Sequence, residues 1–84
     1  MQSVLVELFG KPGCHLCDDA REIVETFLVG RPEVQLIERN ILEDPELFET
    51  MRNDIPVVSV NGKVISRWRL DVAILEKKVE EASK

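Results

Sequence analysis

The length, composition and charge of this chain exclude several classes of protein. Its 84 residues suffice for one domain, residues 1–84, and the 44% hydrophobic and 32% charged residues are typical of a globular domain. No apolar run approaches the roughly 18 residues that a membrane span needs, so we expect no membrane association. A net charge of −5 disfavours binding to phosphates, so we expect no nucleic acid partner.

The first residues give no sign of export. The segment Met1–Val4 has neither a basic region nor a small-residue cleavage site after an apolar stretch. We therefore expect a cytoplasmic protein. In that reducing compartment two neighbouring cysteines are more often redox-active or metal-binding than a structural disulfide.

Residues 3–9 are almost continuously apolar and β-branched, which predicts a central strand covered on both faces. Glu7 is the exception within this run. Its carboxylate could relay the proton of Cys17, or it could reach water on a thinly covered face of the sheet. The second interpretation is the simpler one.

The only two cysteines follow this strand, in the segment Lys11-Pro12-Gly13-Cys14-His15-Leu16-Cys17. A thiol in the first turn of a helix faces unpaired backbone N–H groups and the positive end of the helix dipole, which favour the thiolate. Cys14 is therefore predicted to be a nucleophile. Cys17, one turn later on the same side, can attack a mixed disulfide on Cys14.

The rest of the chain alternates between helical and strand patterns. A helix after the cysteine loop is predicted to end at Gly30, and residues 34–38 form a strand parallel to the first. A second helix begins with Asp44 as N-cap and Pro45 in its first position. Residues 55–60 and 63–65 flank Asn61-Gly62, a type I′ hairpin signal, and an amphipathic helix runs from Leu70.

The predicted fold is an α/β domain of order β-α-β-α-β-β-α with a four-stranded mixed sheet. Cys14 follows the carboxyl end of a parallel strand, where ligands gather in open α/β sheets. This order, the cysteine segment and Ile55-Pro56-Val57 resemble the glutaredoxins, which have a three-layer thioredoxin fold, and the likeness covers essentially the whole chain.

The resemblance implies roles for particular residues. Cys14 is the attacking cysteine, Cys17 resolves the mixed disulfide, and Pro56 is a cis-proline that faces the sulfurs. A trans proline at the start of an edge strand is the alternative that proline statistics favour. The residues expected to contact the substrate are Lys11, Gly13, His15, Ile55, Pro56, Val57, Arg67 and Trp68.

The sequence also departs from the glutaredoxin pattern. Counted from Pro56, the glycine pair and following acidic residues that seat glutathione are replaced by Ser66-Arg67 and then by Trp68, Arg69 and Leu70. Bulk and positive charge at these places predict weak use of glutathione. We expect a thiol–disulfide oxidoreductase that reduces protein disulfides, with electrons from glutathione, a thioredoxin-type system or a dihydrolipoamide.

Several alternatives stay open at this level. Cys14, Cys17 and His15 could bind a metal, but zinc wants four ligands, so only a dimer sharing a cluster remains conceivable. A redox-inert binding module or an iron–sulfur carrier is thus the competing function. His15 could stabilise a thiolate or point into solvent.

The segment Arg67-Trp68-Arg69 also has two interpretations. It could form a cationic, aromatic docking surface for a substrate. Alternatively, Trp68 packs under the last helix and the arginines pair with surplus acids. We expect a monomer without a bound cofactor or metal, whose partners are a disulfide-bearing protein or small thiol substrate and a thiol reductant.

Overall fold

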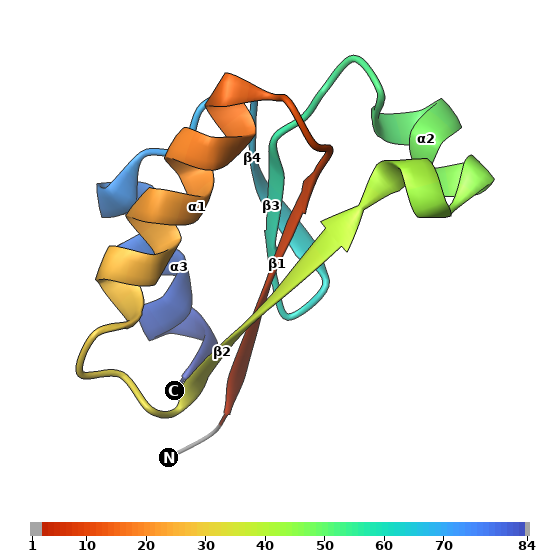
Figure 1. Cartoon of the computed structure of the whole chain (residues 1–84). Helices are drawn as coiled ribbons and strands as arrows, with labels where there is room; N and C mark the ends of the chain where they lie inside the picture. The colour runs from red at the N-terminus through yellow and green to blue at the C-terminus, as the bar shows by residue number, and fades with distance from the viewer. Residues whose placement is uncertain (1–2, 84) are drawn as a thin grey trace.

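The computed structural model describes residues 3–83 and has the predicted order of elements (Figure 1). A short 3₁₀ helix, η1, is the one addition to that order. The elements are β1 (Val4–Gly10), α1 (His15–Leu28), β2 (Val34–Asn40), η1 (Ile41–Glu43), α2 (Pro45–Met51), β3 (Val57–Val60), β4 (Lys63–Arg67) and α3 (Val72–Ala82).

The four strands form one mixed sheet in the order β2-β1-β3-β4. β1 pairs with β2 in parallel, from Val4 opposite Val34 to Gly10 opposite Asn40. β3 is antiparallel to both β1 and β4. The central place of β1 and its parallel neighbour were both predicted correctly.

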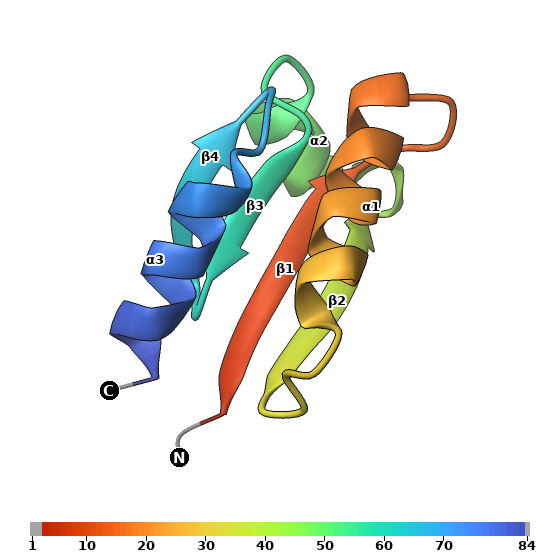
Figure 2. The same cartoon turned by 90° about the vertical axis from the view of Figure 1, so that its left-hand side faces the viewer.

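The helices lie on the two sides of this sheet unequally. α1 and α3 cover one face side by side, whereas the short α2 lies on the other side, near the end where β1 stops (Figures 1 and 2). The main core therefore lies under α1 and α3, where Val6 and Leu8 of β1 pack with Val24 and Leu75. A second cluster at the cysteine end joins Phe9 to residues of η1 and α2.

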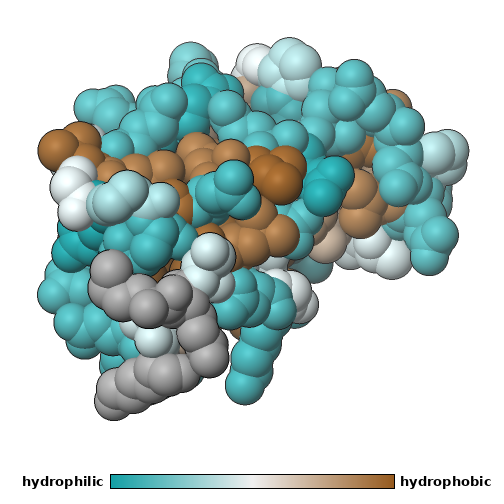
Figure 3. Space-filling model, turned by 90° about the horizontal axis from the view of Figure 1, so that it is seen from below, coloured by the Kyte–Doolittle hydropathy of each residue, from teal (hydrophilic) through white to brown (hydrophobic). Residues whose placement is uncertain are grey.

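The prediction that β1 is covered on both faces was wrong for much of its length. Leu5 and Glu7 alternate with the buried residues of β1 and are only half-buried, because α2 is too short to cover the whole second face. Ile37 and Val64 of the neighbouring strands are exposed. Hydrophobic side chains reach the surface between hydrophilic groups when the molecule is viewed from below (Figure 3).

The predicted turns and caps are present. Asn61 and Gly62 both have positive φ angles, 50° and 85°, as a type I′ hairpin requires. The Asp44 side chain accepts hydrogen bonds from the N–H groups of Glu46 (2.9 Å) and Leu47 (3.4 Å), so it caps α2 as expected.

The strand boundaries differ from the prediction by a few residues. β2 and β4 each extend two residues further, to Asn40 and Arg67, and β3 begins at Val57. A bulge lies where Val58 pairs with Ser66 but Ser59 pairs with Val64, so β4 holds one extra residue there. This shift changes which residues reach the cysteine end of the sheet.

Candidate functional site

Cys14 occupies the N-cap position of α1. The Cys17 N–H donates to the Cys14 Sγ at 3.3 Å, and the Asp18 N–H donates to the Cys14 carbonyl at 3.1 Å. The sulfur thus accepts one of the free N–H groups at the start of the helix. Gly13, whose φ is +79°, turns the chain just before it and is exposed, which leaves Cys14 half-buried at the surface.

Cys17 lies one turn further along α1 and is buried, with 4% of its surface exposed. It belongs to the cluster of Phe9, Ile41, Ile55 and Val57, against which Cys14 also packs. Both cysteines are free thiols. The structure therefore gives the two sulfurs the unequal access that the sequence predicted, because one lies at the surface and the other in a hydrophobic cluster.

Gly10 allows Cys17 to lie against the end of β1. A Cβ at residue 10 would stand 2.9 Å from the Cys17 Sγ and 3.1 Å from its Cβ, closer than side chains approach one another. Sequence reasoning missed this residue. The available signal was a glycine directly after an apolar strand and before the cysteine loop, which indicates a close approach of another group.

The environment of Cys17 raises the pKa of its thiol to about 11 from an ordinary value of 9.0. Burial is the largest cause, and the hydrogen bond to Cys14 is the next; the backbone of Lys11 opposes them. The charges of Cys14 and Asp18 add smaller increases. Cys17 is therefore protonated at neutral pH and reacts only after losing that proton.

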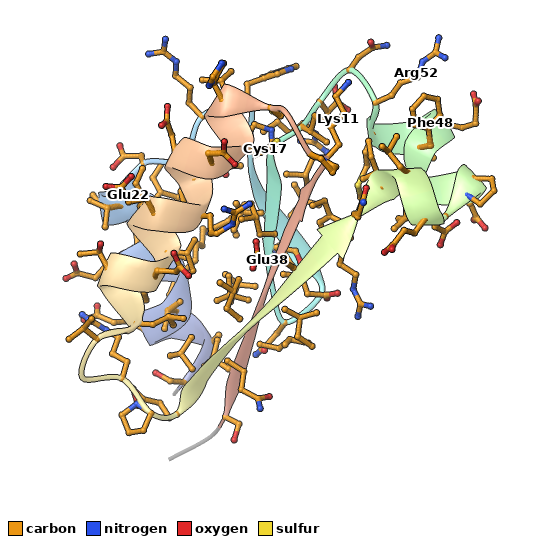
Figure 4. All side chains as sticks on the ribbon, viewed as in Figure 1. Lys11, Cys17, Glu22, Glu38, Phe48 and Arg52 are labelled. Carbon is orange, nitrogen blue, oxygen red and sulfur yellow. The ribbon has the colours of Figure 1, made fainter. Side chains whose placement is uncertain are left out.

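A hollow of about 370 Å³ opens beside Cys17 on the β2 side of α1. Its wall includes Lys11 and the ion pair in which Arg21 donates to Glu38 at 2.6 Å. Figure 4 shows Lys11, Cys17 and Glu38 along this side of the molecule. Lys11 is exposed, so water and salt screen the interaction of its charge with neighbouring groups.

The segment Ile55-Pro56-Val57 lies buried beside the cysteines. The Ile55–Pro56 peptide bond is cis, and Ile55 and Val57 share the cluster that contains Cys17. Pro56 has no N–H to donate, and its carbonyl accepts from the Trp68 N–H at 3.0 Å. The structure thus brings residues 55–57 and the cysteines to one end of the sheet, as the sequence predicted.

The connection between β4 and α3 presents an exposed indole. Trp68 is 55% exposed, so the alternative in which it packs under the last helix was wrong. Arg67 lies 3.9 Å from Asp54, at the limit of an ion pair, and Arg69 makes no ion pair within residues 3–83. The arginines are therefore largely available to other groups.

The turn after the last strand does not lie at Ser66-Arg67, directly after the predicted strand 63–65. Both residues belong to β4, and the residue with left-handed backbone is Trp68, with a φ of +66°. β4 also holds the extra residue of its bulge just before Ser66. The first acidic residue after β4 is Asp71, which caps α3.

Two other candidate residues have plain surroundings. His15 is exposed at the start of α1, as the solvent interpretation predicted. Glu7 accepts from Arg39 at 2.8 Å on the face of the sheet opposite α1, and this ion pair takes the carboxylate that was considered as a proton relay. Within residues 3–83, no three His, Cys, Asp or Glu side chains gather in a metal-binding arrangement.

The strand order, the crossover helix and the two cysteines at the start of α1 define a thioredoxin-fold protein with a dithiol site. The chain belongs to the glutaredoxin-like family, since the family model of the Glutaredoxin-like domain (DUF836) matches residues 5–80. It is 31% identical over 75 residues to the Glutaredoxin-like protein YDR286C homolog of Dictyostelium discoideum, covering 83% of this chain and 69% of that protein.

Solved structures agree on the fold. Protein Ne2328 from Nitrosomonas europaea matches with a TM-score of 0.78 at 19% identity, covering 93% of each chain. Mitochondrial thioredoxin 3 from Saccharomyces cerevisiae, in its oxidized form, matches with a TM-score of 0.69 at 17% identity, covering 96% of this chain and 80% of that one. Among residues 3–83, no helix has the length and apolar character to cross a bilayer.

Proposed function

We propose that this protein is a thiol–disulfide oxidoreductase that acts on protein disulfides through Cys14 and Cys17. The observation that carries the proposal is the pairing of an accessible sulfur at the N-cap of α1 with a buried sulfur one turn away. Such a pair fits a two-step exchange, because the first thiol reaches a partner and the second reaches only the first.

In the first step, the Cys14 thiolate attacks one sulfur of the substrate disulfide. The Cys14–substrate bond forms, the substrate S–S bond breaks, and the second substrate sulfur leaves as a thiolate that takes up a proton. In the second step, Cys17 loses its proton and attacks the Cys14 sulfur. The Cys14–Cys17 disulfide forms, the remaining substrate thiol is released, and the substrate is reduced by two electrons while the protein is oxidised.

The causes of the raised Cys17 pKa favour this order of events. Two of them come from Cys14 itself, through its hydrogen bond and its charge. A mixed disulfide on Cys14 carries no charge, so both contributions fall when the substrate is attached and the pKa of Cys17 decreases. Cys17 then loses its proton more readily than it does beside a Cys14 thiolate.

Glutathione use is proposed to be weak. In the glutaredoxins, glycines let the backbone approach the tripeptide closely, whereas here the left-handed turn carries the Trp68 indole. Arg69 adds a positive charge beside it, and the Asp71 carboxylate accepts the Ala73 N–H as a helix cap at 2.8 Å. Protein disulfides, with another reductant as electron donor, fit this surface better.

The proposal is tested by counting thiols and trapping the intermediate. Purified protein oxidised by a model disulfide should lose both reagent-accessible thiols, measured after unfolding, and regain them with dithiothreitol. Cys17→Ala should accumulate a stable Cys14 mixed disulfide, detectable by mass, whereas Cys14→Ser should accumulate none. A metal assay on the same sample tests the competing function, a metal or iron–sulfur carrier. Thiols that stay reduced, or cysteines that carry metal in place of the disulfide, would overturn the proposal.

A further inference from the structure

Two hollows adjoin on the outer side of α1 and form one groove. The first, of about 290 Å³, lies between Leu16, the residue before Cys17 in the first turn of α1, and the connection that holds Trp68. The second, of about 460 Å³, continues along α1 to Phe27 and is bordered by Val72 at the start of α3. Asp19 and Ile23 line both hollows, so the two adjoin along α1, and we treat them as one groove whose end near Leu16 is called the cysteine end.

Trp68 stands rigidly at the cysteine end of this groove. Its backbone N–H donates to the carbonyls of Asp54 (3.2 Å) and Pro56 (3.0 Å). Its indole Nε1–H donates to the Asn53 carbonyl at 2.8 Å. A tryptophan with a φ of +66° is strained, and these bonds hold it there while leaving the ring exposed. A fixed, exposed aromatic ring is a typical anchor of a binding surface.

The floor of the groove is apolar and its two ends differ in charge. Leu16 is 42% exposed and Val72 is 49% exposed, and Ile23 lies between them, half-buried. Arg69 and Asp19 line the first hollow with one charge of each sign, whereas Asp19 and Glu22 make the far hollow negative. Glu22 borders the far hollow and points away from the sheet (Figure 4).

We propose that this groove binds an extended segment of the protein whose disulfide Cys14 attacks. The segment carries apolar side chains that lie on Leu16, Ile23 and Val72. It has an acidic residue next to its cysteine, facing Arg69, and a basic residue at its far end, facing Glu22. This inference rests on the proposed function, and it adds the class of substrate. That substrate has a disulfide followed by an apolar segment, with an acidic residue near the disulfide and a basic residue further along.

The length of the groove sets the length of the segment. From Leu16 to Phe27 the helix rises by eleven residues, or about 16 Å at 1.5 Å per residue. An extended chain advances roughly 3.3 Å per residue, so about five residues of substrate span the groove. Alternate side chains of that segment face the groove, which calls for apolar residues at every second position.

The test uses the fluorescence of Trp68, the only tryptophan in the chain. The probe is an eight-residue peptide in which serine replaces the substrate cysteine. Glutamate follows it, leucines occupy alternate positions, and lysine stands at the far end. Titration of the reduced full chain should shift the emission to the blue and saturate. A second peptide, with glutamate and lysine exchanged, has the same composition and should bind about tenfold more weakly.

Variants locate the binding site independently of the redox chemistry. Val72→Glu and Arg69→Glu should each weaken binding of the first peptide about tenfold. Val29→Glu, an exposed valine outside the groove, and Lys63→Glu, a cation on the hairpin, should leave it unchanged. Equal affinity for the two peptides, no saturable shift, or equal losses in the control variants would overturn the inference.

A kinetic measurement separates this inference from the proposed function. The disulfide form of the peptide, with cysteine restored, should show a higher KM in Val72→Glu, whereas reduction of a small symmetric disulfide should not change. If the parent protein reduces neither disulfide but binds the first peptide more tightly than the charge-exchanged peptide, the oxidoreductase proposal is wrong and the inference about the groove is supported. If it reduces both disulfides with KM values that Val72→Glu leaves unchanged, the inference about the groove is wrong and the oxidoreductase proposal is supported.

Discussion

The position of Cys17 depends on the missing side chain of Gly10. A hydrogen at this place lets the helix approach the end of β1 until the thiol contacts the backbone, and this contact contributes to the burial that raises the pKa of Cys17. The Cys17 sulfur is thus positioned by a neighbouring strand as well as by its own helix.

Gly10→Ala should displace Cys17 and slow formation of the internal disulfide about tenfold. The added Cβ would overlap the sulfur, and such overpacking costs about 1–3 kcal/mol of stability. Gly30→Ala is the matched control: its φ of +79° makes alanine cost about 1–2 kcal/mol, but the surrounding space is open. Stopped-flow thiol exchange measures both. Equal slowing in the two variants would mean that lost stability, not displacement, is the cause.

The raised pKa of Cys17 predicts a distinctive pH dependence of alkylation. A higher pKa means that less thiolate is present at a given pH, and the thiolate forms only as the pH rises through about 11. The alkylation rate of Cys17 should therefore rise about tenfold per pH unit from pH 8 to 10 without a plateau. Peptide mass mapping follows each cysteine. Cys14 should react first throughout because it is the more accessible sulfur, and a plateau for Cys17 below pH 9 would contradict the prediction.

Elements governed by local chemistry could be predicted from the sequence, and those governed by contacts across the fold could not. Asn61-Gly62 and Asp44-Pro45 fix a turn and a helix start by their own backbone preferences. The 3₁₀ helix η1 was missed because Ile41 is recruited into the cluster around Cys17, a contact that no local pattern reports. The bulge in β4 is also set by pairing with β3.

The site follows the same division. The unequal burial of the two cysteines and the neighbourhood of residues 55–57 could be predicted from motif and spacing. The close approach of Gly10, the exposed Trp68 and the groove along α1 depend on how separate elements meet. The end of β4 at Arg67, two residues beyond the predicted strand, likewise depends on its pairing with β3.

The β4–α3 connection yields a prediction about backbone strain. Trp68→Ala keeps a Cβ at a φ of +66°, whereas Trp68→Gly removes it, so the glycine variant should be more stable than the alanine variant by about 0.5–1 kcal/mol. Urea unfolding measures the difference. At Arg69, where the φ is negative, the order should reverse, with glycine less stable than alanine. The same order at both positions would show that Trp68 is unstrained.

The same Trp68→Gly variant tests the glutathione proposal. If the indole obstructs the tripeptide, removing it should raise the rate of glutathione-coupled reduction of a small mixed disulfide by about tenfold, or roughly 1.4 kcal/mol. Arg69→Gly serves as a comparison that removes charge without opening the turn. If Trp68→Gly reduces the mixed disulfide no faster than the parent, the indole is not the cause of weak glutathione use.

At the scale of the molecule, residues 3–83 form two hydrophobic clusters that differ in their distance from the cysteines. The larger lies between the sheet and the pair α1 and α3, and it includes the fully buried Leu75. The smaller lies at the cysteine end and joins Cys17 to the fully buried Ile41 of η1. In so small a domain each cluster contributes a large share of a marginal stability, but only the smaller one contains Cys17.

Leu75→Ala and Ile41→Ala should therefore destabilise the fold similarly but affect Cys17 differently. Each removes a fully buried aliphatic side chain, which costs about 2–5 kcal/mol in urea unfolding. Under native conditions, Ile41→Ala should also raise the alkylation rate of Cys17 relative to Cys14, because the cavity lies in the cluster that shields the sulfur. Leu75→Ala should leave that ratio unchanged at matched stability, adjusted with a low concentration of urea. An equal rise in both variants would mean that Cys17 becomes accessible only when the whole domain unfolds, and that the smaller cluster does not protect it separately.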